Sequence, residues 1–293
     1  MNKVVVIGGS GFLGSHVSDE LSMRGYDVTI FDQNPSPWIN SKQRFVEGSV
    51  LDRPALVEAC SGARFIYHFG GIADIKEAVA NPYKTIEANV LGTANIFEAL
   101  TSNSVERFVY ASTMYVYSEA GSFYRASKQS AEVIIEAYCE VRELGYSLLR
   151  YGSLYGPRAQ EWNGLRGYVR QVIEEGKLDY PGSGDERREY IHVQDAARLS
   201  VDVLDPKHRN QAITVTGSQI LNSSELVEMI FEISGKTPNV SFLEDARRKE
   251  HYRITPYRYV PRQAKKLVPS EFIDLGQGIL EVCEEFGLER DFA

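Results

Sequence analysis

A tyrosine and a lysine stand four residues apart at the start of a long helical pattern. Tyr124 and Lys128 therefore share one face of the expected helix. A free tyrosine titrates near pH ~10, and a neighbouring positive charge stabilises the phenolate and lowers that pKa. Such a phenol can take a proton from a substrate hydroxyl as hydride leaves the same carbon. Thr113 follows a short apolar run and is expected to bind the same substrate oxygen, with Ser112 as the alternative; the candidate catalytic residues are Thr113, Tyr124 and Lys128.

The YxxxK spacing also arises by chance on surface helices, so its chemistry depends on a second signal, a glycine-rich turn. Gly8, Gly11 and Gly14 have the spacing GxxGxxG between the apolar run 4–7 and a helical pattern. Gly8 would allow a tight turn, Gly11 the approach of a pyrophosphate, and Gly14 close contact of helix and strand. A bare glycine pattern can be a purely structural turn, but its place as the first strand–helix turn favours a dinucleotide site.

A carboxylate after the second expected strand indicates which dinucleotide is bound. Asp32 would accept hydrogen bonds from a ribose diol and repel a 2′-phosphate, which favours NAD over NADP. The neighbouring Gln33 is a further candidate cofactor contact. The alternative is a turn aspartate, because the chain turns at 33–35. With NAD bound, the oxidised nicotinamide would add to the charge of Lys128 in stabilising the Tyr124 phenolate.

The elements that must position these residues alternate between strands and helices. Short apolar runs at 4–7, 28–31, 65–68, 108–111 and 147–150 predict buried strands, and 12–24, 81–100 and 124–144 predict helices. This alternation predicts an α/β fold with a Rossmann-type doubly wound parallel sheet.

Beyond residue 150 the pattern is less regular. Glycines interrupt 152–187. After this stretch we expect a strand at 189–193, a helix at 194–204, a strand at 212–215, a helix at 224–233 and a basic, proline-containing stretch at 253–269. We expect an NAD-binding domain formed by 1–155 and 187–216, and a smaller mixed α/β substrate-binding domain formed by 156–186 and 217–293.

Composition excludes several classes of protein. The 293 residues are 43% hydrophobic and 25% charged with a net charge of −8, typical of a folded protein and unfavourable for nucleic-acid binding. The three cysteines form no CxxC, and the five histidines have no metal-ligand spacing, so no metal is expected. Glycines end the first apolar run after four residues, too early for a signal peptide or membrane helix, so we expect a cytoplasmic protein.

Together these motifs resemble the extended short-chain dehydrogenase/reductases, specifically the NAD-dependent epimerase/dehydratase family that acts on nucleotide sugars. The resemblance covers nearly the whole chain. It rests on the motifs at 4–16, 32, 68–71, 89–93, 109–117, 124–128, 149–158 and 188–195.

The resemblance implies further site residues. On the cofactor side these are Phe12 and Leu13 along the pyrophosphate, Ser49 and Val50 at the adenine, Phe69, Gly70 and Gly71 along the cofactor, and Tyr151 near the nicotinamide. On the substrate side they are Thr113, Ser153, Arg188 on the diphosphate, and Arg262 as a further phosphate contact. A solvated surface charge is the alternative for Arg188.

The chain also departs from the family pattern. Ser49 replaces an aspartate that contacts the adenine amino group, and Ser153 replaces an asparagine, so both contacts are altered. The loop at 118–123 is short, which should open or reshape the substrate pocket. Met114 and Tyr115 follow Thr113 where dehydratases and decarboxylases of the family carry acids, which disfavours dehydration and decarboxylation.

The resemblance therefore implies an NAD-dependent nucleotide-sugar epimerase, in which NAD takes and returns a hydride while Tyr124 acts as acid and base. The alternatives are a nucleotide-sugar ketoreductase or dehydrogenase and, from another class, an NAD-sensing regulator without chemistry. The family also implies a homodimer in which the helices 81–100 and 124–144 form a four-helix bundle.

Overall fold

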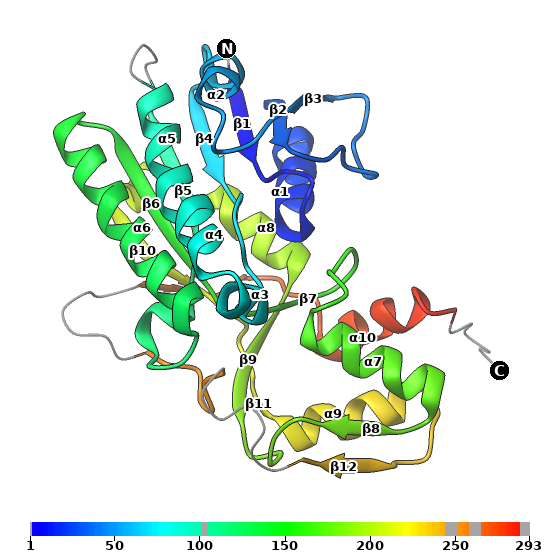
Figure 1. The fold of residues 1–293 in the computed structure, drawn as a ribbon. Helices are drawn as coiled ribbons and strands as arrows, with labels where there is room; N and C mark the ends of the chain where they lie inside the picture. The colour runs from blue at the N-terminus through cyan, green and yellow to red at the C-terminus, as the bar shows by residue number, and fades with distance from the viewer. Residues whose placement is uncertain (1, 101–104, 244–250, 258–264, 288–293) are drawn as a thin grey trace.

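The structure is a computed structural model that describes residues 2–100, 105–243, 251–257 and 265–287. Its centre is an eight-stranded sheet in the order β13-β10-β6-β5-β4-β1-β2-β3, with every neighbouring pair parallel (Figure 1). The strands are β1 Lys3–Ile7, β2 Asp27–Asp32, β3 Gln43–Glu47, β4 Phe65–His68, β5 Arg107–Thr113, β6 Gly145–Tyr151, β10 Gln211–Val215 and β13 Lys265–Leu267.

Helices cover both faces of this sheet because both faces of its central strands are apolar. In β1, Val4 and Val6 pack under α1 (Phe12–Met23) and α8 (Val193–Asp202). Val5 and Ile7 point to the opposite face. That face is covered by α2 (Arg53–Cys60), α5 (Gly92–Ala99) and α6 (Ser122–Val141). The predicted doubly wound parallel sheet is confirmed.

A second lobe lies beyond the carboxyl edge of the sheet (Figure 1). It contains α7 (Gly164–Glu175), α9 (Ser223–Ile233) and α10 (Leu275–Glu284), which share one apolar core. Its strands are β7 Ser153–Tyr155, β9 Arg187–His192 and β11 Ile220–Asn222 in one sheet, and β8 Leu178–Tyr180 with β12 Val240–Phe242 in another. Between β12 and α10 the chain returns once to the large sheet, where β13 pairs with β10.

Two stretches differ from the sequence expectation for physical reasons. The glycine-interrupted stretch 152–187 contains α7, because the Asn163 side chain caps its first turn and Leu165, Val169 and Val172 bury one face. The expected helix 81–100 is divided into α4 (Pro82–Ile86), a π-helical turn (Glu87–Leu91) and α5. Short helices such as α3 (Ile75–Ala80) carried no periodic signal long enough to predict.

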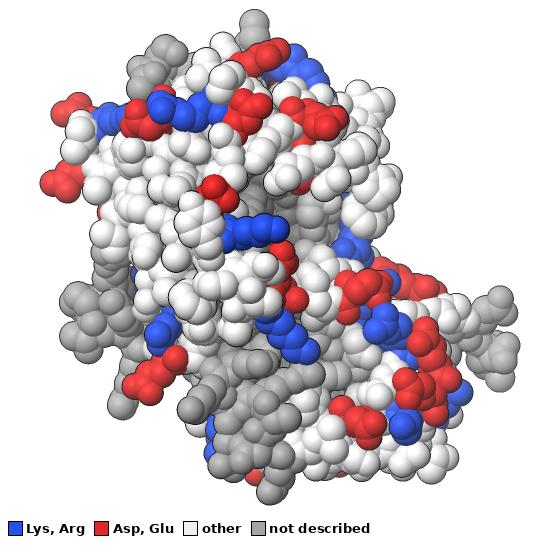
Figure 2. All heavy atoms as spheres, in the orientation of Figure 1, with Lys and Arg blue, Asp and Glu red and all other residues white. Residues whose placement is uncertain are grey.

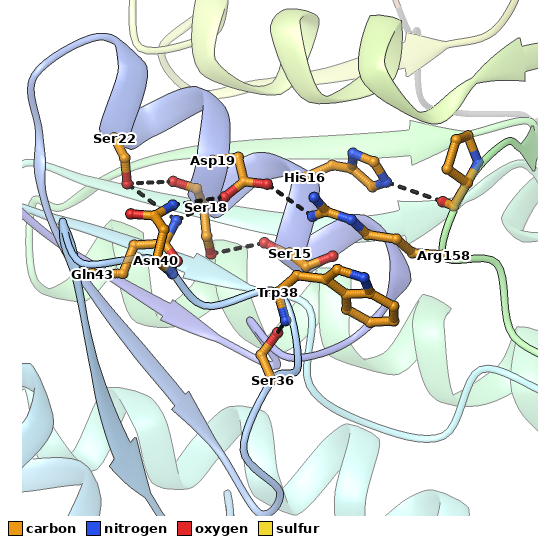
Figure 3. A network of polar contacts seen from close by, with 12 residues as sticks. Ser15, His16, Ser18, Asp19, Ser22, Ser36, Trp38, Asn40, Gln43 and Arg158 are labelled. Atoms are coloured by element: carbon orange, nitrogen blue, oxygen red, sulfur yellow. Dashed lines mark hydrogen bonds and ion pairs between the residues drawn. The ribbon is translucent and has the colours of Figure 1, made fainter. Parts of the chain in front are cut away.

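A polar network joins the first helix to the second lobe (Figure 3). Asp19 on α1 accepts hydrogen bonds from Arg158 at 2.8 Å, Gln43 at 3.0 Å and Asn40 at 3.1 Å. The Arg158 guanidinium lies 5.3 Å from the Trp38 ring, and its backbone amide donates to Glu285 just after α10. The network therefore fixes the loop 33–42 and the second lobe against the same helix.

Charge is dispersed on the face shown in Figure 2. Lys and Arg side chains alternate with Asp and Glu over the described residues there, mainly at the top of the molecule and over the lobe of α7 and α10. This face therefore lacks, over those residues, the continuous basic surface that nucleic-acid binding requires. In the described part of the chain, no helix is both long enough and apolar enough to cross a bilayer.

We expect Gly14→Ala to destabilise the fold, because a Cβ at Gly14 would collide with the Gly8 carbonyl oxygen and lie 2.9 Å from the Gly9 Cα. Overpacking of this kind costs about 1–3 kcal/mol of unfolding free energy, measurable by urea denaturation. Gly167→Ala is the matched control: this glycine is also helical, and nothing lies within 4 Å of its Cβ position. Equal stability of the two variants would contradict the close helix–strand packing.

Candidate functional site

A cavity of about 1070 Å³ opens at the carboxyl edge of the large sheet, between the two lobes. The strand order reverses between β1 and β4, and parallel α/β sheets bind ligands at such a switch point. Most of the site residues expected from the sequence line this one cavity. They are Gly8, Gly11, Phe12, Leu13, Gly14, Asp32, Gln33, Val50, Phe69, Gly70, Gly71, Thr113, Tyr124, Lys128, Tyr151 and Arg188.

The glycine turn is packed tightly against the backbone around it at Gly8, whereas at Gly11, among the described residues, only the Gly8 carbonyl oxygen lies within 4 Å of the Cβ position, at 3.4 Å. Gly8 has φ +80°, and a Cβ there would lie 2.6 Å from the carbonyl carbon of Phe69. Gly11 is the N-cap of α1 and has no capping side chain, so the first amides of the helix are not satisfied by one. A helix N-terminus of this kind, bordering a cavity, is suited to binding a pyrophosphate.

Asp32 lies at the end of β2 and is held by two backbone amides. Its Oδ2 accepts from the Ser10 amide at 3.1 Å, and its Oδ1 accepts from the Asn34 amide at 3.3 Å. The bond to Asn34 is the turn interaction considered as the alternative role. Since Asp32 also lines the cavity, the carboxylate fixes the turn and faces the ligand space at once.

Thr113, Tyr124 and Lys128 converge at the other end of the cavity. Thr113 ends β5 and its side chain is hydrogen-bonded to the Tyr124 hydroxyl. The Lys128 ammonium donates to the Ala111 carbonyl at 2.8 Å and lies 6.0 Å from the Tyr124 ring centroid. Tyr124, Lys128 and Thr113 are buried, with exposures of 9%, 5% and 6%. This is the convergence that the sequence predicted.

Burial sets the protonation of this group. It raises the pKa of Tyr124 to about 12, although the hydrogen bond with Thr113 acts in the opposite direction. It lowers the pKa of Lys128 to about 8, against the raising effect of Glu132. Burial therefore favours the neutral phenol in the protein without a dinucleotide. The lowered tyrosine pKa expected from the sequence includes the charge of an oxidised nicotinamide and stays a prediction.

A buried ion pair close to the Thr113–Tyr124–Lys128 group was not predicted. Glu132 and Arg150 are 2% and 1% exposed, and two guanidinium nitrogens donate to the carboxylate at 2.9 and 2.7 Å. The Ser112 hydroxyl donates to the same carboxylate at 2.5 Å, which favours Thr113 over Ser112 at the substrate oxygen. The sequence contains one feature that could have predicted the position of Glu132, because this residue lies four residues beyond Lys128 and therefore on the same helix face.

Arg188 is half-buried in the second lobe and is not fully solvated at the surface. Its guanidinium carbon lies 5.4 Å from the Tyr252 ring centroid. Its Nε is buried and has no hydrogen-bond partner among the described residues. A buried donor of this kind fits an anionic ligand group, because an unsatisfied charged donor is costly.

The remaining residues expected at the site are Tyr151, Ser49, Ser153 and Arg262, and of these only Tyr151 lines the cavity among the described residues. The Tyr151 hydroxyl lies 2.5 Å from Ser200 Oγ on α8, so its ring rather than its hydroxyl faces the cavity. Ser49 accepts from the Leu51 amide and Ser153 bonds Tyr252, and neither is among the described residues that line the cavity. Arg262 lies outside the described residues.

We expect Glu132→Gln to lower the free energy of unfolding by about 3 kcal/mol, because it leaves the Arg150 charge buried without its counter-ion. Urea denaturation measures this loss. Glu140→Gln, on the exposed side of the same helix, should change stability by no more than about 0.5 kcal/mol. Equal effects would show that the buried pair has no special role.

Comparison with known proteins agrees with this geometry. A family model described as the NAD dependent epimerase/dehydratase family matches residues 4–215. A putative UDP-glucose 4-epimerase of Methanocaldococcus jannaschii is 29% identical over 302 residues, covering 95% of this chain and 96% of the relative. A UDP-glucose 4-epimerase of Schizosaccharomyces pombe is 32% identical over 250 residues, covering 69% and 70%.

The fold is shared with a solved structure of the same kind. The UDP-glucose 4-epimerase of Thermotoga maritima, determined with UDP-glucose, superposes with a TM-score of 0.83 at 22% identity, covering 97% of this chain and 98% of that one. The resemblance inferred from the motifs is confirmed. The chain belongs to the NAD-dependent epimerase/dehydratase family of enzymes.

Proposed function

We propose that this protein is an NAD-dependent nucleotide-sugar epimerase, with a UDP-hexose as substrate. The observation that carries the proposal is that one cavity joins the glycine turn, the Thr113–Tyr124–Lys128 group and the half-buried Arg188. Its relatives include UDP-glucose 4-epimerases that match most of the chain. A regulator that only senses NAD would not need a buried phenol, hydroxyl and ammonium group beside one another.

The residues fit NAD at one end of the cavity. We propose that the pyrophosphate lies against the glycine turn, where Gly11 leaves the N-terminus of α1 without a capping side chain, and that the Asp32 carboxylate at the end of β2 binds the adenosine ribose. The residues proposed to hold NAD are Gly8, Gly11, Phe12, Leu13, Gly14, Asp32, Gln33, Val50, Phe69, Gly70, Gly71, Tyr124, Lys128 and Tyr151.

In the proposed reaction NAD supplies a reversible hydride acceptor. Tyr124 takes the proton of the reacting sugar hydroxyl, and Thr113 hydrogen-bonds the same oxygen. Lys128, fixed by the Ala111 carbonyl, adds positive charge beside the phenolate. Bound NAD would accept the hydride and give it back, so no net oxidation would occur, and Tyr124 would return the proton to the same oxygen after the keto sugar has turned over. Met114 and Tyr115 provide no carboxylate for dehydration or decarboxylation.

The division of labour between the lobes follows from these positions. We propose that residues 1–155 and 187–216 bind NAD, while 156–186 and 217–293 bind the nucleotide sugar; the strands β7 and β9 fall in the first set of ranges but pair in the sheet of the second lobe. Arg188 lies at the junction of the two and is proposed to hold the diphosphate. The strand β13 is the part of the second region that belongs to the large sheet.

We also propose a cytoplasmic homodimer. Large apolar side chains are exposed along α4, the following π-helical turn and α6: Tyr83 at 74%, Leu91 at 53%, Val133 at 54% and Val141 at 84%. The helices 81–100 and 124–144 lie next to one another on the same side of the sheet (Figure 1). Two copies of this surface would form a four-helix bundle and bury these residues.

We expect Tyr124→Phe to lower kcat for the interconversion of UDP-glucose and UDP-galactose by about 100-fold or more, because the variant lacks the acid/base hydroxyl. NMR of the products, without added NAD, measures the reaction. Tyr26→Phe, at the amino end of β2 and so at the opposite edge of the sheet, is the control. Wild-type protein that isomerises no nucleotide sugar but consumes NADH with a keto sugar would instead establish a ketoreductase.

Light scattering tests the dimer. We expect twice the chain mass of 32.9 kDa for the wild type. We expect monomers when Leu91 and Val133 are both replaced by glutamate, because the charges cannot be buried at an apolar interface. A monomeric wild type would refute the four-helix bundle.

A further inference from the structure

Tyr115 and His251 form a polar pair in the wall of the cavity. Tyr115 lies two residues after Thr113 in the 3-10 turn Met114–Tyr117, and its amide donates to the Thr113 hydroxyl at 3.3 Å. Its phenol oxygen lies 2.5 Å from Nδ1 of His251. Both residues line the cavity, although 136 positions separate them in the sequence.

The Tyr115 ring lies between the reacting end of the cavity and the proposed phosphate end. It packs edge-on against Tyr124, with ring centroids 5.9 Å apart, and at a tilt against Tyr252, at 4.7 Å. Arg188 lies on the Tyr252 ring at 5.4 Å. A sugar with its reacting hydroxyl at Tyr124 and its diphosphate at Arg188 therefore has to pass Tyr115.

The ring is held in place from the other side by the short loop 118–121. Gly121 has φ +92°, and a Cβ at this position would lie 2.7 Å from Cδ1 of Tyr115. The short loop thus packs its glycine against the ring. With His251 on the hydroxyl and Gly121 on the ring edge, Tyr115 is fixed in one orientation.

A fixed phenol can recognise a sugar hydroxyl. The phenol oxygen has one donor and two acceptor positions, and the bond with His251 uses one of them. Burial raises the pKa of Tyr115, so the phenol keeps its proton.

We propose that Tyr115, oriented by His251, is a specificity-determining residue that hydrogen-bonds a non-reacting hydroxyl of the substrate sugar. This inference rests on the proposed function, since it assumes a nucleotide sugar in the cavity. Tyr115 contacts the sugar, and His251 acts through Tyr115 as a positioning residue. Recognition of the sugar then depends on a residue after β5 and on one from the segment 251–257, which come together only in the folded chain.

Binding of UDP and of UDP-glucose to the NAD-loaded protein, measured by calorimetry, separates contacts with the sugar from contacts with the nucleotide. We expect Tyr115→Phe to weaken UDP-glucose binding by roughly threefold to tenfold, the range for one lost hydrogen bond, and to leave UDP binding unchanged. In turnover, KM should rise by a similar factor while kcat changes less than twofold, because the ring that packs on Tyr124 is retained.

Tyr26→Phe is the control, because it also removes one phenol hydroxyl but Tyr26 precedes β2 at the opposite edge of the sheet and is not among the described residues that line the cavity. It should leave the ratio of UDP-glucose to UDP affinity unchanged. His251→Ala should reproduce the effect of Tyr115→Phe. His251→Asn should restore most of the affinity, because an asparagine amide can occupy the position of Nδ1.

The possible results are distinct. If Tyr115→Phe leaves the ratio of UDP-glucose to UDP affinity unchanged, or weakens the binding of both ligands equally, the role of Tyr115 is overturned. The epimerase function is unaffected by that result as long as the wild type isomerises UDP-glucose. If the wild type binds UDP-glucose no more tightly than UDP, the protein makes no favourable contact with the sugar, and the role of Tyr115 is overturned. Wild-type protein that binds neither ligand would overturn the proposed function and this inference together.

Discussion

The Glu132–Arg150 ion pair is the constraint on which the geometry of the site depends. It joins α6, which carries Tyr124 and Lys128, to β6, and the Ser112 hydroxyl adds β5 to the same carboxylate. A third contact runs from Arg150 to the Tyr117 hydroxyl at 2.5 Å. A buried pair contributes little net stability, because desolvation offsets its attraction, but a slipped register would leave both charges unpaired. The pair thus selects the one register of α6 that turns the phenol and ammonium group toward the cavity.

Burial has a second effect at the same place. The low polarity around Tyr124 and Lys128 opposes ionisation of both, which raises the pKa of the phenol and lowers that of the amine. A positively charged nicotinamide beside the phenol would act in the opposite direction on the tyrosine. In the proposed enzyme the acid/base group would therefore become most effective when oxidised NAD is bound.

The cavity belongs to neither lobe alone. Its cofactor end is formed by turns at the carboxyl edge of the large sheet, and Arg188 and Tyr252 come from the strands and the 251–257 segment of the second lobe. The Asp19–Arg158 bond and the approach of Trp38 to Arg158 fix the two lobes against α1 (Figure 3). Small movements between the lobes would change the distance from Arg188 to Tyr124, which a nucleotide sugar bound as proposed would have to span.

Local sequence determined the features that depend on short-range physics. Buried parallel strands such as β1 are continuous apolar runs, glycine spacing marks the turn that a phosphate approaches, and positions 124 and 128 must share a helix face. The same rules failed where long-range packing determines the structure. The helix α7 forms despite its glycines because the second lobe buries one of its faces. The segment 265–267 pairs with the large sheet, which no local pattern indicated. The burial of the Arg188 Nε atom, the pairing of Glu132 with Arg150 and the contact of Tyr115 with His251 were also decided only by tertiary structure. Each depends on segments distant in the chain, and the desolvation that determines their chemistry exists only once those segments have packed together.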